Sequence, residues 1–284
     1  MSLRRRALSI SRRLLSPASD AAALGRLSLL TFGAGASGVL GLSNEKNTPV
    51  PRVVSNEAFS AALASSSSTS ISAGLFHTAV VCNDSLWTFG RGAGGRLGHG
   101  DDSDAPFPQR VSLTEGFAQP LAVAAGGLHT LLLLRDGRLL STGYGGFGAL
   151  GSGTYKPRSS FELVNSLPPL QAVAAGGAHS LGIARDGRLY SWGRDEGEGR
   201  FGNSPQDEGG SPAPSHAPLP AGVGEATHIA AGGFHSLVAA RIVSHPQQGG
   251  DENYRAGDAG DDASCVVLSC GGNANGECGR SGGA

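Results

Sequence analysis

Short apolar runs separated by polar or glycine-containing turns make up most of this chain, and residues 160–193 show the pattern most clearly. Strand-forming residues fill four segments there, at 160–164, 170–175, 179–184 and 188–191. The last two are joined by Arg185-Asp186-Gly187. Two apolar runs joined by Asp-Gly predict a β-hairpin, because a tight primed turn needs positive φ, which glycine tolerates and aspartate can reach. No segment of helical period and useful length interrupts these strands, so the pattern predicts an all-β fold of four-stranded units.

The same pattern recurs along the chain. Residues 174–193 read A-A-G-G-A-H-S-L-G-I-A-R-D-G-R-L-Y-S-W-G, residues 124–143 and 72–90 follow the same order, and residues 230–239 open a fourth copy. The marker histidines lie 52, 50 and 56 residues apart and are His77, His129, His179 and His235. A period near fifty residues predicts a repeat architecture in which each unit buries its faces against its neighbours. Four-stranded units at this spacing are typical of β-propeller blades.

A glycine pair precedes the histidine in three of the copies. The paired residues are Gly126 and Gly127, Gly176 and Gly177, and Gly232 and Gly233. A backbone crowded toward a central axis has no room for a Cβ atom, so glycine pairs at this point of each repeat fit a propeller.

The pattern A-A-G-G-x-H-S-L, followed by D-G-R-L-Y-S-W-G and G-x-x-G-x-x-G, resembles the repeat of the regulator of chromosome condensation 1 family over roughly residues 27–280. The resemblance implies a propeller of seven four-stranded blades, closed where strands from the C-terminus complete an N-terminal half blade. Residues 27–42 match such a half blade, and further repeats are expected at about 43–98, 99–151, 152–202 and 203–284. We therefore expect about four to five blades of seven, an incomplete ring with unprotected sheet edges, and interpret the chain as a truncated isoform or an incomplete gene model.

Charge is unevenly distributed. The formal net charge is −1, and residues 1–26 hold six arginines and one aspartate, so they carry +5 and residues 27–284 carry −6. Leucines and an isoleucine alternate with these arginines, which predicts an organelle transit peptide, and the arginine density favours the mitochondrial matrix over plastids. A secretory signal would need an uninterrupted apolar core, and a disordered basic tail or nuclear signal is the alternative. No apolar run reaches the roughly 18 residues of a membrane span.

Two longer inserts, 203–220 and 242–264, are expected to be mobile loops. The first contains five prolines and the second five acidic residues, which makes the second a poor nucleic-acid contact. Loops are also expected at the prolines between blades, because proline cannot donate to a strand ladder. These are Pro106, Pro108, Pro157, Pro168 and Pro169.

No constellation of residues predicts catalysis. A histidine that recurs once per blade indicates a role repeated in each blade, such as a hydrogen bond between neighbouring strands. The four cysteines form no C-x-x-C pair, so zinc is not expected and reduced thiols are: Cys82, Cys265, Cys270 and Cys278. The glycine-rich loops, such as residues 143–151, lack the following helix that a phosphate site requires, and we interpret them as blade connections. We expect no catalytic residue, cofactor or metal site.

The resemblance implies a binding surface but does not identify the partner. The founding nuclear member is an exchange factor for a small GTPase and contacts chromatin. The plant UV-B photoreceptor senses light through clustered tryptophans, whereas the residues before the marker histidines here are Phe76, Leu128, Ala178 and Phe234. Trp87 and Trp192 lie at hairpin positions, where aromatic packing is the expected role.

Mitochondrial members of the family support organelle gene expression, including intron splicing and complex I assembly. An arginine-rich presequence joined directly to a half blade resembles their arrangement. We therefore expect a mitochondrial, non-enzymatic scaffold that binds protein or ribonucleoprotein partners through propeller loops, with guanine-nucleotide exchange for a small GTPase as the alternative. Direct nucleic-acid binding stays open.

Overall fold

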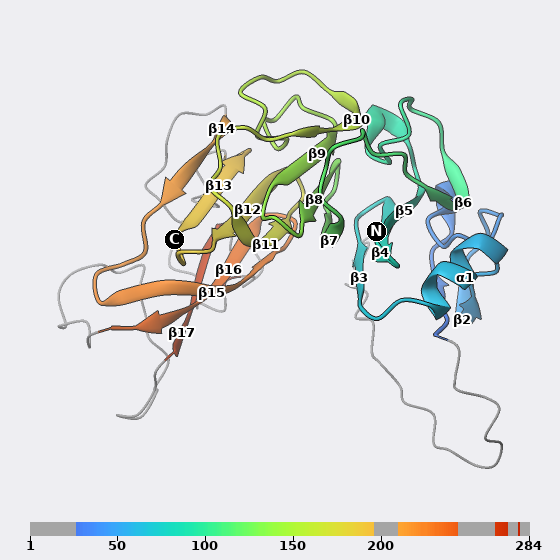
Figure 1. The fold of residues 1–284 in the computed structure, drawn as a ribbon, viewed down its shortest axis with the longest axis horizontal. Coiled ribbons are helices and arrows are strands. Elements are labelled where there is room, and N and C mark those ends of the chain that lie inside the picture. The colour runs from blue at the N-terminus through green and yellow to red at the C-terminus, as the bar shows by residue number, and fades with distance from the viewer. Residues whose placement is uncertain (1–26, 196–209, 244–264, 272–277, 279–284) are drawn as a thin grey trace, which may run out of the picture.

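A computed structural model describes residues 27–195, 210–243, 265–271 and 278. The predicted transit peptide, the insert at 242–264 beyond residue 243 and the first part of the insert at 203–220 lie outside the described residues. The described chain is built from β-strands, short 3-10 turns and one α-helix (Figure 1).

The strands form five antiparallel sheets, and within each sheet they follow one another in sequence order. A two-stranded sheet comes first, made of β1 (Leu30–Gly33) and β2 (Thr48–Val53). Three four-stranded sheets and one three-stranded sheet follow. Their strands are β3 (Thr69–Ala73), β4 (His77–Cys82), β5 (Ser85–Gly90), β6 (Ala105–Arg110), β7 (Pro120–Ala125), β8 (His129–Leu134), β9 (Leu139–Gly143), β10 (Arg158–Leu163), β11 (Leu170–Ala175), β12 (His179–Ala184), β13 (Leu189–Gly193), β14 (Ser211–Ala217), β15 (Val223–Ala231), β16 (His235–Ile242) and β17 (Cys265–Gly271).

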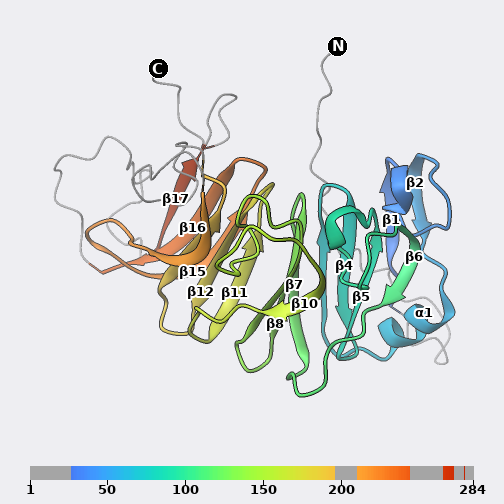
Figure 2. The same ribbon diagram turned by 90° about the horizontal axis from the view of Figure 1, so that it is seen from above.

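The sheets stand side by side along a curved path, and the two-stranded and three-stranded sheets lie at its opposite ends (Figures 1 and 2). The first strands of successive sheets, β3, β7, β11 and β15, contact one another in that order, whereas β6, β10 and β14 are the outer strands of their sheets. This is the arrangement of propeller blades around part of a ring. The described sheets form an arc, which confirms the predicted all-β propeller class with an incomplete ring.

The central hairpins have the predicted strands, but their turns differ from the prediction. In β12–β13, His179 pairs with Gly193 and Ile183 with Leu189. Only Gly187 has a positive φ in the connecting turn, 81°, while Asp186 instead accepts a hydrogen bond from Arg188 N at 3.1 Å. The predicted primed turn was therefore wrong here, because a longer loop lets glycine alone take the left-handed conformation.

A turn with positive φ at two central residues occurs in the first four-stranded sheet. Asn83 and Asp84 connect β4 to β5 with φ of 46° and 55°. Two residues are sufficient here because Cys82 pairs directly with Ser85. Asparagine and aspartate reach this conformation more readily than other non-glycine residues.

Prolines occur inside outer strands, contrary to the expectation that they lie in loops. Pro106 and Pro108 belong to β6, and β14 contains Pro212 and Pro214. The carbonyls of Pro106 and Pro212 accept hydrogen bonds from the preceding sheet's loop, at 2.9 Å and 2.8 Å. In a β-strand, the nitrogen and the carbonyl of one residue point to the same side. The nitrogens of these two prolines therefore point away from the paired strand, and their missing N–H groups remove no hydrogen bond between the strands, as edge positions permit.

The composition of the sheets also corrects two groupings inferred from the sequence. The segment at 160–164, grouped with the strands that follow it, lies largely in β10, which pairs with β9 of the preceding sheet. The predicted loop at 203–220 contains β14, which pairs with β13. An outer strand completes the sheet before it because a meander places each new strand beside the last one formed.

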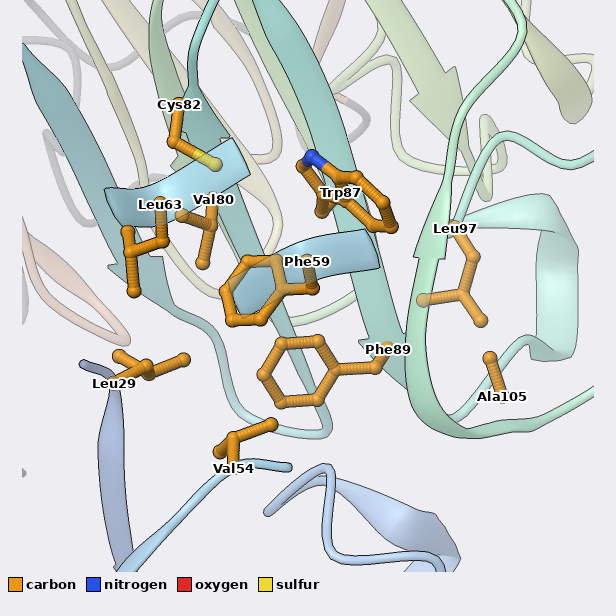
Figure 3. Packing of buried hydrophobic residues seen from close by; sticks show 10 residues of the cluster. All are labelled: Leu29, Val54, Phe59, Leu63, Val80, Cys82, Trp87, Phe89, Leu97 and Ala105. Carbon is orange, nitrogen blue, oxygen red and sulfur yellow. The ribbon is translucent and has the colours of Figure 1, made fainter. Parts of the chain in front are cut away.

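Helix α1 (Glu57–Ala64) covers the first four-stranded sheet and was not predicted. Asn56 caps it, because its side chain accepts a hydrogen bond from Phe59 N at 3.0 Å. Phe59 and Leu63 are fully or almost fully buried and pack against β4 and β5, and the Phe59 and Trp87 ring centroids are 5.5 Å apart (Figure 3). Eight residues give only two turns of apolar periodicity, too few to identify from sequence. In the described part of the chain, no helix has the length and hydropathy to cross a membrane.

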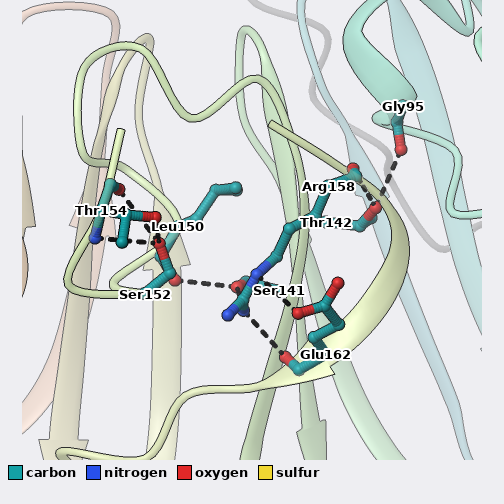
Figure 4. Close-up of polar contacts among 8 residues, drawn as sticks. All are labelled: Gly95, Ser141, Thr142, Leu150, Ser152, Thr154, Arg158 and Glu162. Carbon is teal, nitrogen blue, oxygen red and sulfur yellow. Dashed lines mark hydrogen bonds and ion pairs between the residues drawn. The ribbon is translucent and has the colours of Figure 1, made fainter. Parts of the chain in front are cut away.

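The interpretation of the glycine-rich loops as connections between blades was wrong: residues 91–104 join β5 to β6 and residues 144–157 join β9 to β10, in each case within one sheet. These loops nevertheless contact a neighbouring sheet. The loop after β5 reaches the second four-stranded sheet, where Gly100 N donates to Ser159 O at 2.9 Å. Thr142 Oγ1 lies 2.9 Å from both Gly95 O of that loop and Arg158 O of its own sheet (Figure 4). These contacts fix the outer halves of adjacent blades against each other.

Candidate functional site

The marker histidines bridge successive sheets. The Nε2 atoms of His77 and His129 lie 2.7 Å from Thr130 Oγ1 and 2.8 Å from Ser180 Oγ, respectively. His179 repeats the contact with Ser236 Oγ at 3.0 Å. In each case the hydroxyl belongs to the residue after the next histidine, so an H-S or H-T dipeptide supplies both halves of the contact.

The hydroxyl partners determine how these rings are protonated. Thr130 donates its proton to Arg96 O at 2.6 Å, and Ser180 donates to Ala149 O at 2.8 Å. A hydroxyl has one proton, so it must accept from histidine Nε2–H, and the neutral ring has its lone pair on Nδ1. Nδ1 of His77 and of His129 is buried without a partner among the described residues.

Burial keeps these rings neutral. It lowers the pKa of His77 to about 3, and the positive charge of Arg96 acts in the same direction. Burial likewise lowers the pKa of His129 to about 3, with the neighbouring His179 as the second cause. A ring with such a low pKa and no path to solvent does not serve as a general base near pH 7.

The glycine pairs lie where the backbones of successive sheets meet. Gly127 N donates to Gly176 O at 2.9 Å. A Cβ built on Gly126 would lie 2.6 Å from Gly176 O, and one on Gly127 would lie 2.5 Å from Gly177 O. Gly177 repeats this geometry against Gly233 O, also at 2.5 Å. Close approach of the backbones therefore excludes any side chain at these positions.

The fourth copy of the motif has different surroundings. A Cβ on Gly233 would have no atom within 4 Å, and the atoms nearest to one on Gly232 belong to the ring of its own His235. His235 is half-buried, and among the described residues its ring does not repeat the histidine–hydroxyl contact of His77, His129 and His179. The fourth histidine and glycine pair thus lie at the end of the described series of contacts.

The two tryptophans pack inside the blades. Trp192 is fully buried and its Nε1 donates to Ala149 O at 2.8 Å, the carbonyl that also accepts from Ser180. Trp87 packs edge-on against Phe59. Neither ring lies in a cluster of tryptophans.

The described residues contain no group of three or more potential metal ligands. The four cysteines are free thiols, and burial raises the pKa of Cys82 to about 11. The shared geometry of histidine, hydroxyl and glycine can hold sheets together but offers no exposed nucleophile or acid.

A row of aromatic and arginine side chains lies on the surface beside the histidines, and sequence reasoning missed it. The residue after the third strand of each sheet donates its N–H to the carbonyl of the residue before the histidine, from Arg91 to Phe76, from Tyr144 to Leu128 and from Arg194 to Ala178. The sequence signal that could have found this row is the arginine or tyrosine that directly follows the glycine at positions 90, 143 and 193.

Side chains in this row stack on one another across the sheets. The Cζ atoms of Arg91 and Arg96 lie 5.5 Å and 5.7 Å from the Phe76 ring centroid. Arg194 Cζ lies 4.4 Å from the Phe147 centroid, and Phe147 contacts Tyr144 edge-on at 5.6 Å. We name Phe76, Arg91, Arg96, Tyr144, Phe147 and Arg194 the aromatic–arginine row. Phe76, Arg91 and Tyr144 are exposed, Phe147 and Arg194 are half-buried, and Arg96 is buried. Exposed aromatic and arginine side chains are enriched where proteins bind partners.

Comparison with known proteins identifies the repeat. The model of the regulator of chromosome condensation (RCC1) repeat matches residues 28–81, 83–133 and 186–239, and a second model of the repeat matches 121–149 and 171–200. The RCC1 domain-containing protein RUG3, mitochondrial, of Arabidopsis thaliana is 34% identical over 253 residues, covering 81% of this chain and 56% of the relative. The ultraviolet-B receptor UVR8 of Arabidopsis thaliana is 39% identical over 100 residues, 34% of this chain and 21% of the receptor.

Solved structures share the fold. Prp20p of Saccharomyces cerevisiae, whose structure is described with its binding properties to Gsp1p and histones, aligns with a TM-score of 0.61 and 22% identity over 76% of this chain and 52% of that chain. Human WBSCR16 aligns with a TM-score of 0.61 and 23% identity, over 74% of this chain and 53% of that one. The chain spans about half the length of these matched proteins.

Proposed function

Because this chain belongs to the regulator of chromosome condensation repeat family, we propose that it is a non-enzymatic propeller scaffold that binds protein or ribonucleoprotein partners in mitochondria. In this proposal it supports mitochondrial gene expression, through intron splicing and the assembly of complex I. The observation that carries the binding role is the aromatic–arginine row, which lies at the surface beside buried, neutral histidines.

The histidines and glycine pairs act structurally in this proposal. The three buried histidines share one geometry, from the Nε2 atom to a hydroxyl of the next sheet at 2.7–3.0 Å. A contact repeated at each blade boundary supports the positioning of the blades rather than a single reaction centre. The surface row is then held at fixed spacing by the ladder beneath it.

The mitochondrial location rests on the sequence of residues 1–26 and on similarity to a mitochondrial relative. The segment combines six arginines with one acid. RUG3 carries a mitochondrial location in its description and aligns over 81% of this chain. Both observations favour the mitochondrial matrix over the nuclear and plastid alternatives.

The test follows the chain in cells with a fluorescent C-terminal tag, with and without residues 1–26. We expect mitochondrial import that depends on these residues, and we expect loss of the protein to leave mitochondrial introns unspliced. Nuclear accumulation of the full chain would contradict the location. Normal splicing after its loss would contradict the role in gene expression.

Guanine-nucleotide exchange is the second candidate, favoured by the fold shared with Prp20p, a protein described as binding Gsp1p. An exchange factor accelerates nucleotide release from its GTPase, whereas a scaffold does not. Release of fluorescent GDP from purified Gsp1p and from a mitochondrial small GTPase, with and without the full chain, separates the two. Faster release would make exchange the leading function.

A further inference from the structure

Two arginines share one aromatic ring at the start of the aromatic–arginine row. Arg91 and Arg96 both place their guanidinium carbons within 5.7 Å of the centroid of Phe76. The Phe76 side chain is 38% exposed, and the neighbouring Leu75 is 51% exposed. Two cations and an apolar surface therefore meet at one end of the first four-stranded sheet.

The fold holds this cluster rigidly. Arg91 N donates to Phe76 O at 2.8 Å, which fixes the backbone of one arginine beside the ring. Arg96 is only 4% exposed, and its Nε and Nη1 atoms donate to Ala93 O at 2.8 Å and to Gly127 O at 2.9 Å. Its remaining nitrogen, Nη2, has no hydrogen-bond partner among the described residues. A guanidinium held by two carbonyls is preorganised to bind with its free edge.

The cluster lacks a matching anion. Within the described part of the chain, the ion pairs closer than 4.0 Å involve other arginines, namely Arg135, Arg138, Arg158 and Arg188. Burial lowers the pKa of Arg96, and the charge of Arg91 lowers it further. The negative charges of Asp102 and Asp104 oppose that effect without forming an ion pair with Arg96, and Asp104 Oδ1 already accepts from Gly92 N at 2.8 Å. An anion bound between the arginines would relieve their mutual repulsion.

We propose that Arg91 and Arg96 bind a carboxylate side chain of a protein partner, with an apolar partner residue against Phe76 and Leu75. This inference rests on the proposed function only in taking the partner to be a protein. A carboxylate matches the planar fork of an arginine in size and geometry. A nucleic acid is disfavoured, because residues 27–284 carry −6 and a long polyanion depends on many positive contacts along its length, whereas a single carboxylate needs only one such cluster.

The test titrates the purified full chain with a capped five-residue peptide in which one glutamate lies between two leucines. The arginine Nε–Hε resonances report binding by nuclear magnetic resonance. The same peptide with glutamine in place of glutamate is the ligand control. We expect saturable shifts of the arginine signals with the glutamate peptide and none with the glutamine peptide.

Two variants of matched charge locate the site. Arg91→Gln removes an exposed member of the cluster, and Arg110→Gln removes an exposed arginine at the far end of strand β6 in the same sheet. We expect R91Q to weaken binding about fivefold, which corresponds to about 1 kcal/mol, and R110Q to leave it unchanged.

Equal binding by the two variants, equal binding of the two peptides, or no saturable shift would overturn the proposal. Stronger shifts of the same signals by a twelve-residue oligouridylate would also overturn it and would assign the cluster to RNA. The measurement uses purified protein, so its failure is distinct from a failure of mitochondrial import or intron splicing.

Discussion

The glycine pair offers a comparison of one substitution at two equivalent positions, Gly127→Ala and Gly233→Ala. At Gly127 the new Cβ would lie 2.5 Å from Gly177 O of the next sheet, whereas at Gly233 no atom lies within 4 Å. Neither glycine has a positive φ, so alanine is compatible with both backbones. The two variants thus differ in contact with a neighbouring sheet and not in conformational strain.

The expected loss of stability in G127A follows from that contact. A methyl group forced against a packed backbone costs about 1–3 kcal/mol. The displacement also stretches the bond from Gly127 N to Gly176 O, now 2.9 Å, whose net worth is about 1 kcal/mol. We expect G127A to lower the free energy of unfolding by about 2–4 kcal/mol. Alanine also reduces the entropy of the unfolded chain by about 0.4–1 kcal/mol, but this acts on both variants and leaves their difference unchanged.

Urea denaturation followed by the fluorescence of the two buried tryptophans, Trp87 and Trp192, measures the difference. For an m-value of about 3 kcal/mol/M, we expect the G127A midpoint to fall by about 1 M and the G233A midpoint to stay within about 0.3 M of the parent. Equal midpoints for the two variants would refute the reasoning, because the sheet-to-sheet contact would then contribute nothing. A large loss in G233A alone would show that the fourth glycine pair meets a neighbour.

Three further predictions concern buried groups. His129→Ala should cost about 1–3 kcal/mol in urea denaturation, because it leaves a buried hydroxyl without its donor, and His235→Ala should cost under about 0.5 kcal/mol; equal losses would contradict the ladder. Because burial lowers the pKa of His77 and His129 to about 3, the unfolded chain binds their protons first, so stability should be complete above about pH 6.5 and fall as the pH drops toward 3. The melting temperature should decline over that pH range less steeply in His129→Gln than in the parent. Equal slopes would contradict the claim that the buried histidines cause the loss of stability. Cys82, whose thiol pKa burial raises to about 11, should resist a thiol reagent in the folded chain while exposed Cys265 reacts, and equal labelling rates would be inconsistent with this packing.

Local pattern was sufficient to predict the class of fold. Apolar runs of about six residues at a fifty-residue period specify strands that bury both faces, and β4, β8 and β12 are buried along their whole length. The glycine pairs and histidines could be assigned to repeated positions for the same reason. Their partners could not, because the hydroxyl that pairs with His77 lies 53 residues away at Thr130.

Features that depend on an edge or a long-range contact were missed. Proline is excluded from a strand only where that strand has hydrogen-bonded neighbours on both sides. Strands β6 and β14 lie at the outer edges of their sheets and therefore accommodate it. Helix α1 is amphipathic over only eight residues, so its apolar face is recognisable only once β4 and β5 are in place to receive it. The aromatic–arginine row likewise has no motif, since its members come from separate repeats.

The sequence by itself determined the repeat, the strand-rich architecture and the asymmetry between a basic first segment and an acidic remainder, because these depend on residue type and local period. The tertiary structure decided which strands share a sheet, which histidines are buried and neutral, and where two unpaired arginines meet one phenylalanine. Burial and backbone approach act between residues about fifty positions apart. A sequence pattern indicates that such contacts recur, but only the packed sheets determine which atoms meet.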